Sequence, residues 1–199
     1  MKEIRKLDLQ FRAEDETDNM KIKGYAVVFN SPETYSYTEV IDEHALDEAD
    51  MSDVVLRYNH EDTFMVLART RNKSLNLSVD DKGLLMEAQL QDDITQHRDI
   101  YNAIKSGLID KQSFAFTVDE DSYDYDTDTR TILKIGKLFD VSVVDQPFYN
   151  ATDVSLASEN DDFLERREEL RKKHEEEIKE NERKTKLQEA KDKVFKKLG

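Results

Sequence analysis

The chain has 199 residues, of which 38% are charged and 37% hydrophobic, and it carries a net charge of −15 with a pI of about 4.7. This acidity argues against a nucleic-acid-binding groove, because phosphate contacts depend on clustered Lys and Arg. The absence of cysteine excludes disulfides, thiolate chemistry and Cys-based zinc sites, and the absence of any run of about 18 apolar residues argues against a membrane span.

Most of the elements predicted along residues 1–157 are strands. Residues 1–16 lack the apolar region of a signal peptide, so we expect an intracellular protein. Gly136 is expected to bend the strand predicted over residues 132–144. Period-2 alternation and short apolar runs between turn residues predict strands over residues 2–12, 21–30, 53–59, 74–79, 83–90, 113–118 and 132–144.

Two helical segments interrupt these strands. One lies near residues 42–50, and a stronger one spans residues 92–107, with acidic residues at its start and Gly107 as its expected end. Many short strands with few helices favour a mostly β domain of the α+β class, built as a barrel or a folded-over sheet, over a layered α/β domain. About 150 residues can bury an adequate core for such a domain.

The composition changes near Ser158, which divides the chain into a domain over residues 1–157 and a tail over residues 158–199. The tail holds equal numbers of acidic and basic residues, so the domain carries the whole net charge. Its high content of Glu, Lys, Arg and Leu, with i,i+4 pairs such as Glu168–Lys172, predicts a long helix. The apolar residues are spaced too irregularly for a strict heptad. We therefore expect a mostly solvated helix, either a simple charged extension or a docking segment.

Among the four histidines, His60 is the strongest candidate for chemistry. His44, His97 and His174 lie in polar or acidic stretches, where a position on the solvated surface is the usual case. His60 directly follows the apolar segment 53–59, and strand ends are where a rigid scaffold positions a reactive group. A neutral imidazole at such a position can take a proton near pH 7.

Metal binding and paired-carboxylate catalysis are weaker alternatives. The adjacent residues 60–62 cannot all face one ion, and no His-x-x-x-His pair is present. The acidic run 119–128 offers aspartates at calcium-loop spacing, but Thr129 and Ile135 stand where that loop needs Gly and Glu, so a solvated hairpin is expected. With 45 acidic residues, carboxylate pairs arise by chance. We expect neither a metal nor a cofactor.

Ser113 stands at the start of the predicted strand 113–118, on the face opposite Phe114 and Phe116. A serine there is usually an ordinary polar residue on the wetter face of a sheet. Its hydroxyl becomes a nucleophile only where a base removes its proton and a third group orients that base. Asp140, on a later strand among apolar residues, is one candidate for this third group, although chemistry alone does not favour it over Asp145.

Seven short segments follow one another in order within residues 24–152: GYAVVFN, EVIDEHAL, VVLRYNHED, LART, DDKGLLMEAQL, GLIDKQSFAF and KLFDVSVVDQPFYNAT. Together they resemble the prohead (procapsid maturation) protease family of tailed phages, serine peptidases that are similar to the herpesvirus assemblins. The resemblance covers about two thirds of the chain. It implies a β-barrel of the herpesvirus-protease type surrounded by helices, to which the long C-terminal helix is added.

The resemblance assigns catalytic roles to three residues. The family's Asn-His-Asp/Glu segment matches residues 59–61 and makes His60 the general base, while its Ser-Phe-x-Phe segment makes Ser113 the nucleophile. The Leu-x-Glu/Asp-Val-Ser segment matches residues 138–142 and nominates Asp140 as the acid that orients His60. The assemblins use a second histidine in that role, and no histidine of this chain lies at that place.

Arg69 belongs to a fourth matching segment. The chain has Leu-Ala-Arg at residues 67–69, where the family commonly has Leu-Gly-Arg. Arg69 either helps to stabilise the anion that forms during catalysis or makes a structural salt bridge.

The resemblance also implies a function. It describes a serine endopeptidase that digests scaffold, capsid-protein extensions and itself inside the procapsid, in the host cytoplasm. The expected partners are capsid protein, scaffold segments and a second copy of the chain, because assemblins are activated by dimerisation. The charged tail would suit recruitment to scaffold and later removal by self-cleavage. The alternative is a non-catalytic assembly or scaffold protein, and the two are distinguished by whether Ser113 and His60 lie within hydrogen-bond reach.

Overall fold

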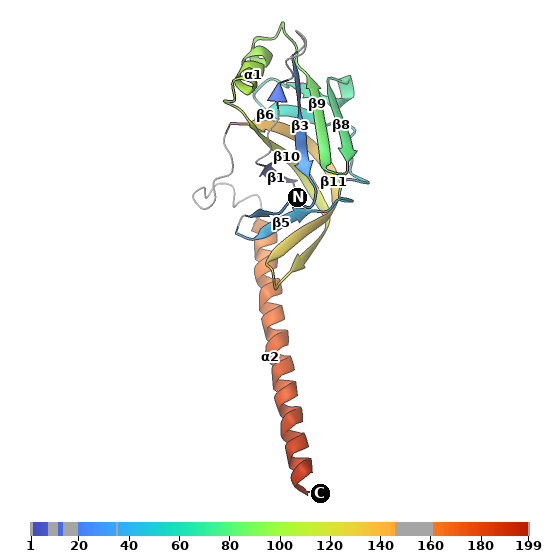
Figure 1. The fold of residues 1–199 in the computed structure, drawn as a ribbon, viewed down its shortest axis with the longest axis vertical. Coiled ribbons are helices and arrows are strands. Elements are labelled where there is room, and N and C mark those ends of the chain that lie inside the picture. The colour runs from blue at the N-terminus through green and yellow to red at the C-terminus, as the bar shows by residue number, and fades with distance from the viewer. Residues whose placement is uncertain (1, 8–11, 14–19, 35, 146–160, 199) are drawn as a thin grey trace. The chain divides into compact units, whose positions relative to one another are not determined.

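The computed structural model describes residues 2–7, 12–13, 20–34, 36–145 and 161–198. The chain forms two compact units, Met1–Asp153 and Val154–Gly199. Within the described residues, the first unit contains two β-sheets and the helix α1 (Thr95–Lys105), and the second contains the helix α2 (Asp161–Leu198) (Figure 1).

Seven strands form the larger sheet and four form the smaller one. The larger sheet consists of β1 (Lys2–Leu7), β4 (Glu33–Thr34), β5 (Thr38–Ile41), β6 (Val55–Tyr58), β7 (Ala68–Arg69), β10 (Lys111–Asp124) and β11 (Thr129–Val144). The smaller sheet consists of β2 (Arg12–Ala13), β3 (Lys21–Val28), β8 (Leu75–Asp80) and β9 (Gly83–Gln89). A 3₁₀ turn, η1 (Thr70–Asn72), follows β7.

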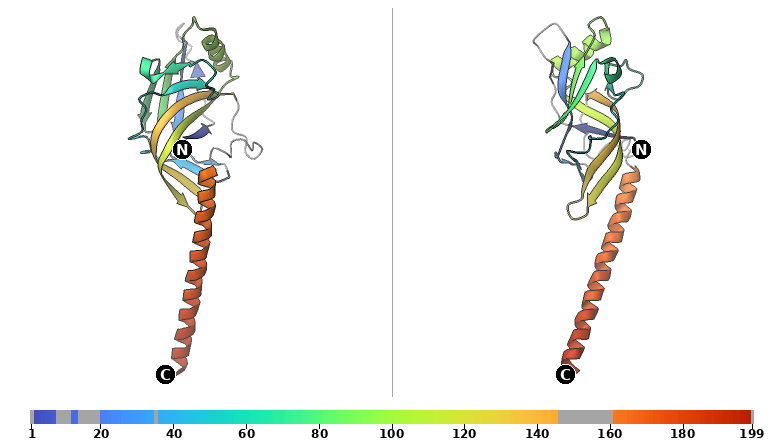
Figure 2. Two further views of the ribbon diagram at one scale, coloured as in Figure 1. Left: turned by 180° about the vertical axis from the view of Figure 1, so that it is seen from behind. Right: turned by 90° about the vertical axis from the view of Figure 1, so that its right-hand side faces the viewer.

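The hairpin of β10 and β11 is the centre of the larger sheet. The two strands pair antiparallel from residues 111–124 to residues 129–144 and run side by side in both views of Figure 2. β1 pairs antiparallel with the other edge of β10. β5 and β6 pair in parallel with opposite ends of β11. The acidic run 119–128 therefore covers the end of β10 and the turn that joins it to β11, which confirms the hairpin predicted there.

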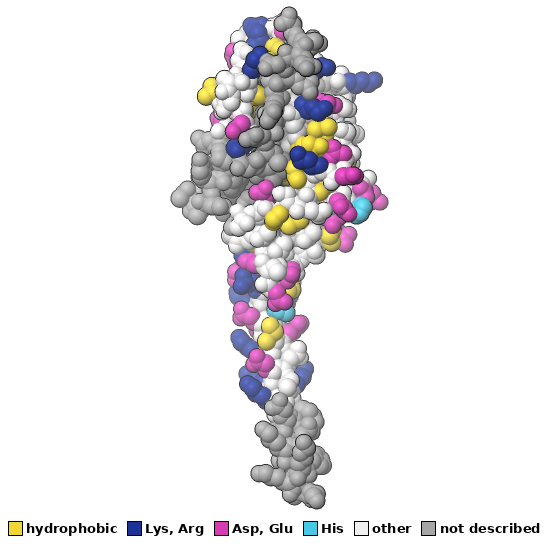
Figure 3. Space-filling model, viewed as in Figure 1, with side chains coloured by type: hydrophobic (Ala, Val, Ile, Leu, Met, Phe, Trp, Pro, Cys, Tyr) yellow, Lys and Arg dark blue, Asp and Glu magenta, His cyan; other side chains and the backbone are white. Residues whose placement is uncertain are grey.

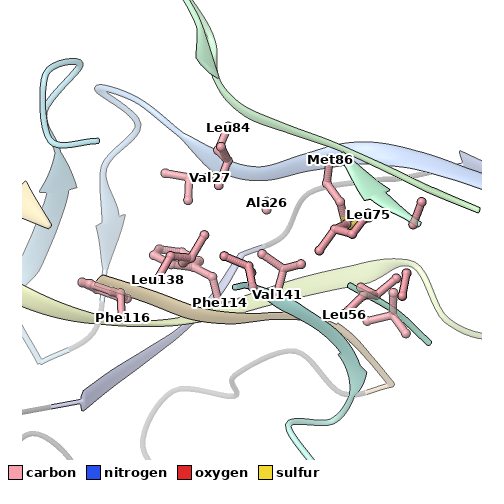
Figure 4. Close-up of a cluster of buried hydrophobic side chains, with 14 of the residues drawn as sticks. Ala26, Val27, Leu56, Leu75, Leu84, Met86, Phe114, Phe116, Leu138 and Val141 are labelled. Carbon is pink, nitrogen blue, oxygen red and sulfur yellow. The ribbon is translucent and has the colours of Figure 1, made fainter. Parts of the chain in front are cut away.

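The two sheets pack face to face over a hydrophobic core. The period-2 alternation of β10 sends Phe114 and Phe116 to one face, where both rings are fully buried and stack with their centroids 4.8 Å apart. Figure 4 shows the two sides of this core. Residues of the smaller sheet (Ala26, Val27, Leu75, Leu84 and Met86) face residues of the larger sheet (Leu56, Phe114, Phe116, Leu138 and Val141).

The prediction of a mostly β domain of the α+β class is confirmed, but the expected closed barrel is wrong. The described strands form two separate sheets, and no ladder pairs a strand of one with a strand of the other. The core is therefore enclosed by two packed faces and not by a continuous cylinder of hydrogen bonds. Alternating inward and outward residues occur in both architectures, so the sequence pattern did not distinguish them.

The bend expected at Gly136 lies inside β11, which stays continuous. Between the pairs Thr117↔Lys137 and Glu120↔Lys134, Gly136 and Asp119 have no partner in the β10–β11 register. Such unmatched residues form β-bulges, which increase the local twist of a hairpin. A Cβ at Gly136 would lie 2.3 Å from Asp119 Oδ1, so any other residue would displace this carboxylate.

Helix α1 confirms the helix predicted within residues 92–107. Its buried residues His97, Ile100 and Ile104 are spaced by three and four and so form one face. Gly107 follows the helix with a φ of 77°, and its N–H donates to the Ile104 carbonyl at 3.0 Å. The expected glycine stop is therefore present, since glycine adopts the left-handed conformation without steric cost.

The helix expected near residues 42–50 is wrong. The chain forms consecutive turns there, in which the N–H groups of Ala45, Asp47 and Ala49 each donate to the carbonyl three residues earlier. The Ile135 N–H donates to the Ala45 carbonyl at 2.8 Å, and Ala45 and Leu46 are buried. Packing and hydrogen bonding to β11 therefore fix this segment in place of a helical ladder.

The long helix predicted in the tail is present as α2, which spans 38 residues. Lys and Arg side chains alternate with Asp and Glu along its described surface in Figure 3. Two i,i+4 ion pairs, Glu175–Lys179 at 4.0 Å and Glu180–Lys184 at 3.3 Å, support the helix as the charge pattern predicts. Among the described residues, no helix is both long and apolar enough to cross a membrane.

Candidate active site

A tight turn at the end of β6 positions His60. Asn59 and His60 have positive φ values of 49° and 58°, and the Glu61 N–H donates to the Tyr58 carbonyl at 3.0 Å. Two consecutive positive φ values closed by such a bond are typical of a type I′ turn. Asparagine tolerates this conformation better than most residues, whereas for His60 it is an uncommon conformation of the kind that clusters at functional sites.

The turn is tied to β11 through Asn59. The Asn59 N–H donates to the Val143 carbonyl at 3.0 Å, and its Oδ1 accepts from the Asp145 N–H at 3.2 Å. The His60 N–H donates to Ser142 Oγ at 3.3 Å. These bonds direct the His60 ring back over the sheet instead of away from it.

Ser113, Asp140 and Ser142 present the polar face beneath this ring. Ser113 on β10 lies opposite Ser142 on β11, and Asp140 lies opposite Ala115. Because side chains alternate along each strand, these residues project from the face opposite to Phe114 and the core. All three are buried, with 3% or less of each residue exposed.

The structure brings Ser113, His60 and Asp140 into one hydrogen-bonded chain. His60 Nδ1 lies 2.5 Å from Asp140 Oδ1, and His60 Nε2 lies 2.5 Å from Ser113 Oγ. An ionised carboxylate only accepts hydrogen bonds, so Nδ1 carries the proton that faces Asp140 and the neutral ring presents Nε2 as an acceptor to the serine. The serine, the imidazole and the carboxylate therefore have the mutual geometry of a catalytic triad.

Asp140 is held in its ionised form. Burial raises the pKa of this carboxyl. The hydrogen bond and electrostatic effect of His60, the Lys2 ammonium and the Ser142 hydroxyl lower it by more, so the net pKa lies below its ordinary value. Lys2 Nζ is 3.3 Å from Asp140 Oδ2, and Ser142 Oγ is 3.1 Å from Asp140 Oδ1. Ser142 Oγ also lies 3.2 Å from His60 Nδ1. The carboxylate is thus available to stabilise a protonated imidazole.

Ser113 is covered by β1. It has no exposed surface, and its Oγ donates to the Arg5 carbonyl at 2.8 Å. A hydroxyl carries one hydrogen, so the Arg5 carbonyl and His60 Nε2 compete for the same proton. In this arrangement Ser113 contacts the His60 ring but is closed to solvent.

The other predicted residues lie elsewhere. Arg69 forms a bidentate pair with Asp53, with Nε 2.5 Å and Nη2 2.7 Å from the two carboxylate oxygens, which is the salt bridge that was one of its two expected roles. His44 is exposed beside Asp47, and His174 lies on α2.

The prediction that His97 lies on the surface is wrong. Only 3% of this residue is exposed. Its Nδ1 accepts from the Gln91 N–H at 3.1 Å, so Nε2 carries the proton and donates to the Val66 carbonyl at 3.0 Å. His97 therefore connects α1 to two loops as a fully hydrogen-bonded structural residue.

The comparison with protein families agrees with this geometry. The model of one family, described as caudovirus prohead serine protease, matches residues 7–166. The chain belongs to this family. Membership indicates a serine protease with a role in the maturation of the phage capsid. No curated protein and no solved structure matches the chain.

Sequence reasoning did not predict that Ser142 and the strand β1 of this prohead protease lie at the site. Ser142 was part of a matched segment but had no assigned role, although its alternation with Asp140 on β11 places both on one face. The β1 strand was predicted as a strand, but its pairing with β10 at Ser113 joins positions more than 100 residues apart. No local pattern contains that information.

Proposed function

We propose that this prohead protease is a serine endopeptidase in which Ser113, His60 and Asp140 are the catalytic residues. The observation that supports it most is the position of the His60 ring, with Nδ1 on Asp140 and Nε2 on Ser113 at 2.5 Å each. Ser113 Oγ attacks the scissile carbonyl carbon while His60 Nε2 takes its proton. Asp140 holds the ring in the required tautomer and stabilises the imidazolium that forms.

The remaining steps use the same groups. His60 returns the proton to the departing amine, the carbon–nitrogen bond breaks, and the acyl group stays on Ser113. Water, deprotonated by His60, then releases the acyl group as a carboxylic acid. Backbone N–H groups of the β10 region would stabilise the oxyanion. Arg69 is not assigned to that task, because its guanidinium is bound by Asp53. The scheme requires no metal or cofactor.

The substrates we propose are scaffold segments, capsid-protein extensions and the chain itself, cleaved inside the procapsid in the host cytoplasm. Membership of the prohead protease family supports this assignment. The charged surface of α2 would serve recruitment to scaffold or association with a second copy of the chain.

Self-processing provides a test that needs no known substrate. The intact mass of the concentrated protein would be followed over time beside Ser113→Ala and His60→Ala variants. We expect discrete loss of mass in the parent and none in either variant. Equal trimming of all three would identify a contaminating protease. If the parent stays intact even when mixed with capsid protein and scaffold, the chain is the non-catalytic assembly protein of the alternative.

A further inference from the structure

The position of β1 defines how a substrate would lie in this site. β10 has β11 along one edge and β1 along the other, paired from Lys2↔Thr117 to Leu7↔Gln112. Ser113 is in the paired region, opposite residue 6 of β1. Protease substrates and many other peptides bind as an added strand along a sheet edge, where backbone hydrogen bonds give affinity and side-chain pockets give specificity. β1 occupies the only edge of β10 that β11 leaves open.

A substrate and β1 cannot occupy this edge together. A peptide to be cleaved must place a carbonyl carbon against Ser113 Oγ, and the Arg5 carbonyl already lies there, 2.8 Å from that atom. The Arg5 oxygen accepts the serine hydrogen, so β1 fills the position that a substrate carbonyl would take. Lys2 adds a second contact at the site through its ion pair with Asp140.

Besides the backbone ladder with β10, buried charged side chains hold β1 in place. Arg5 is 3% exposed, and its Nε and Nη2 bind the two carboxylate oxygens of Glu39 on β5, the latter at 2.7 Å. Glu3 is bound by both terminal nitrogens of Arg130 on β11, at 2.8 and 3.0 Å. The Arg5 guanidinium also lies over the Phe116 ring, 5.7 Å from its centroid.

The hydrogen bonds of Glu39 indicate which side chain it accepts from a strand in the place of β1. Glu39 on β5 and Arg130 on β11 belong to the body of the domain, and Arg130 Nη1 lies 3.1 Å from Glu39 Oε2. Without β1, Glu39 would lose both hydrogen bonds that the Arg5 guanidinium donates to its two oxygens. A buried carboxylate requires a charged or hydrogen-bonding partner, because an unpaired charge away from water is strongly destabilising. Glu39 presents two oxygens, a geometry that suits the fork of an arginine better than the point charge of a lysine.

We propose that the substrate binds as an extended segment in place of β1, with an arginine side chain on Glu39 and the bond on the carboxyl side of that arginine at Ser113. The proposal rests on the proposed protease function, and it names the substrate class. Hydrolysis adds one water across this bond and gives an arginine carboxylate and a new amine. β1 is then the intramolecular occupant that any substrate must displace.

Two quenched fluorescent peptides test this inference, one with the sequence KEIRKL at its centre and one with KEIAKL. They would be offered to the full-length parent and to an Arg5→Glu variant, in which a carboxylate facing Glu39 expels β1. We expect Arg5→Glu to cleave both peptides faster than the parent does. The arginine peptide should show a kcat/KM about 10- to 100-fold higher than the alanine peptide, the range expected for hydrogen bonds to a charged group. Fragment masses should place the cut after arginine.

Glu39→Gln removes the charge and keeps the shape of the side chain. We expect the preference for arginine to fall below about threefold in this variant, since a neutral amide replaces the carboxylate. Glu87→Gln is the matched control, because Glu87 makes an exposed ion pair with Lys23 on the smaller sheet. If Glu39→Gln does not fold, the ratio of kcat/KM for the arginine peptide to that for the alanine peptide, measured in the parent and in Arg5→Glu, decides whether arginine is preferred.

The outcomes separate this inference from the proposed function. Cleavage of both peptides at equal rates, or cleavage at another bond, would overturn the inference and leave the protease function standing. A lack of cleavage by the parent and by Arg5→Glu, together with the absence of any self-processing, would contradict both.

Discussion

Replacement of Asp140 by asparagine tests the orienting role of the buried carboxylate. Asp140 Oδ1 accepts from His60 Nδ1 at 2.5 Å and from Ser142 Oγ at 3.1 Å, while Oδ2 faces Lys2 Nζ at 3.3 Å. If the new NH₂ group faces His60, Nδ1 must accept and the proton moves to Nε2, so the ring can no longer take the serine proton. If it faces Lys2, two donors meet and the imidazolium still loses its counter-charge.

In either orientation of the asparagine amide, His60 loses its interaction with a carboxylate, and this interaction acts mainly in the transition state. A comparable loss of the correct tautomer in a serine protease lowers kcat about 10⁴-fold, equivalent to about 5 kcal/mol. The assay is the initial rate of hydrolysis of the faster of the two peptides described above, with urea unfolding as a check on the fold. We expect a fall of this size in kcat and little change in KM.

Asp145→Asn is the matched control for this experiment. Asp145 follows β11 five residues after Asp140, and its Oδ2 accepts from the exposed Tyr58 hydroxyl at 2.6 Å. We expect its activity to stay within about threefold of the parent, because the hydrogen bond to Tyr58 is exposed and contributes little. An Asp140→Asn enzyme that keeps more than about a tenth of the parent activity, or an equal loss in both variants, would refute the assignment of Asp140.

Three further predictions concern the surroundings of the triad. Ser142→Ala removes a hydroxyl 3.2 Å from His60 Nδ1 and should lower kcat about 3- to 10-fold; a loss equal to that of Asp140→Asn would contradict a supporting role. Phe114→Ala should reduce the free energy of unfolding by about 3–5 kcal/mol in urea, because the ring is fully buried, and a change below about 1 kcal/mol would argue against this core. Burial raises the pKa of Glu3, but Arg130 and Arg5 bring it below the ordinary 4.5. Its contribution to stability is therefore complete above about pH 4.5 and is lost as the pH falls through the lowered pKa. Hydrogen exchange of β1 amides should lose protection there, and unchanged protection down to pH 3 would count against the ion-pair network.

Local patterns in the sequence predicted much of the scaffold. Alternation in the segment SFAFTV placed Phe114 in the core and Ser113 on the opposite face, and both positions agree with the structure. Gly107 was recognised as the end of α1 because its conformational freedom is a local property. The position of His60 at the end of an apolar strand was also readable, and the type I′ turn gives the physical reason for the Asn-His pair.

Features that depend on distant pairing could not be read in this way. Arg5 and Glu39 are 34 residues apart, and Glu3 and Arg130 are 127 apart, so no spacing rule connects them into one buried network. The polar stretch around His97 indicated a surface position, whereas hydrogen bonds to Gln91 and Val66 allow it to be buried. The separation of the two sheets likewise depends on strand edges that do not pair, which alternation does not encode.

The most direct test of the central claim is the identity of the residue that reacts with a fluorophosphonate, which phosphonylates activated serines. Labelled protein would be digested and the modified peptide identified by mass, for the parent, Arg5→Glu and His60→Ala. The account predicts one adduct on Ser113, slow in the parent where β1 covers this residue, faster in Arg5→Glu, and absent in His60→Ala. An adduct on another serine, or labelling of Ser113 that is unaffected by His60→Ala, would contradict it.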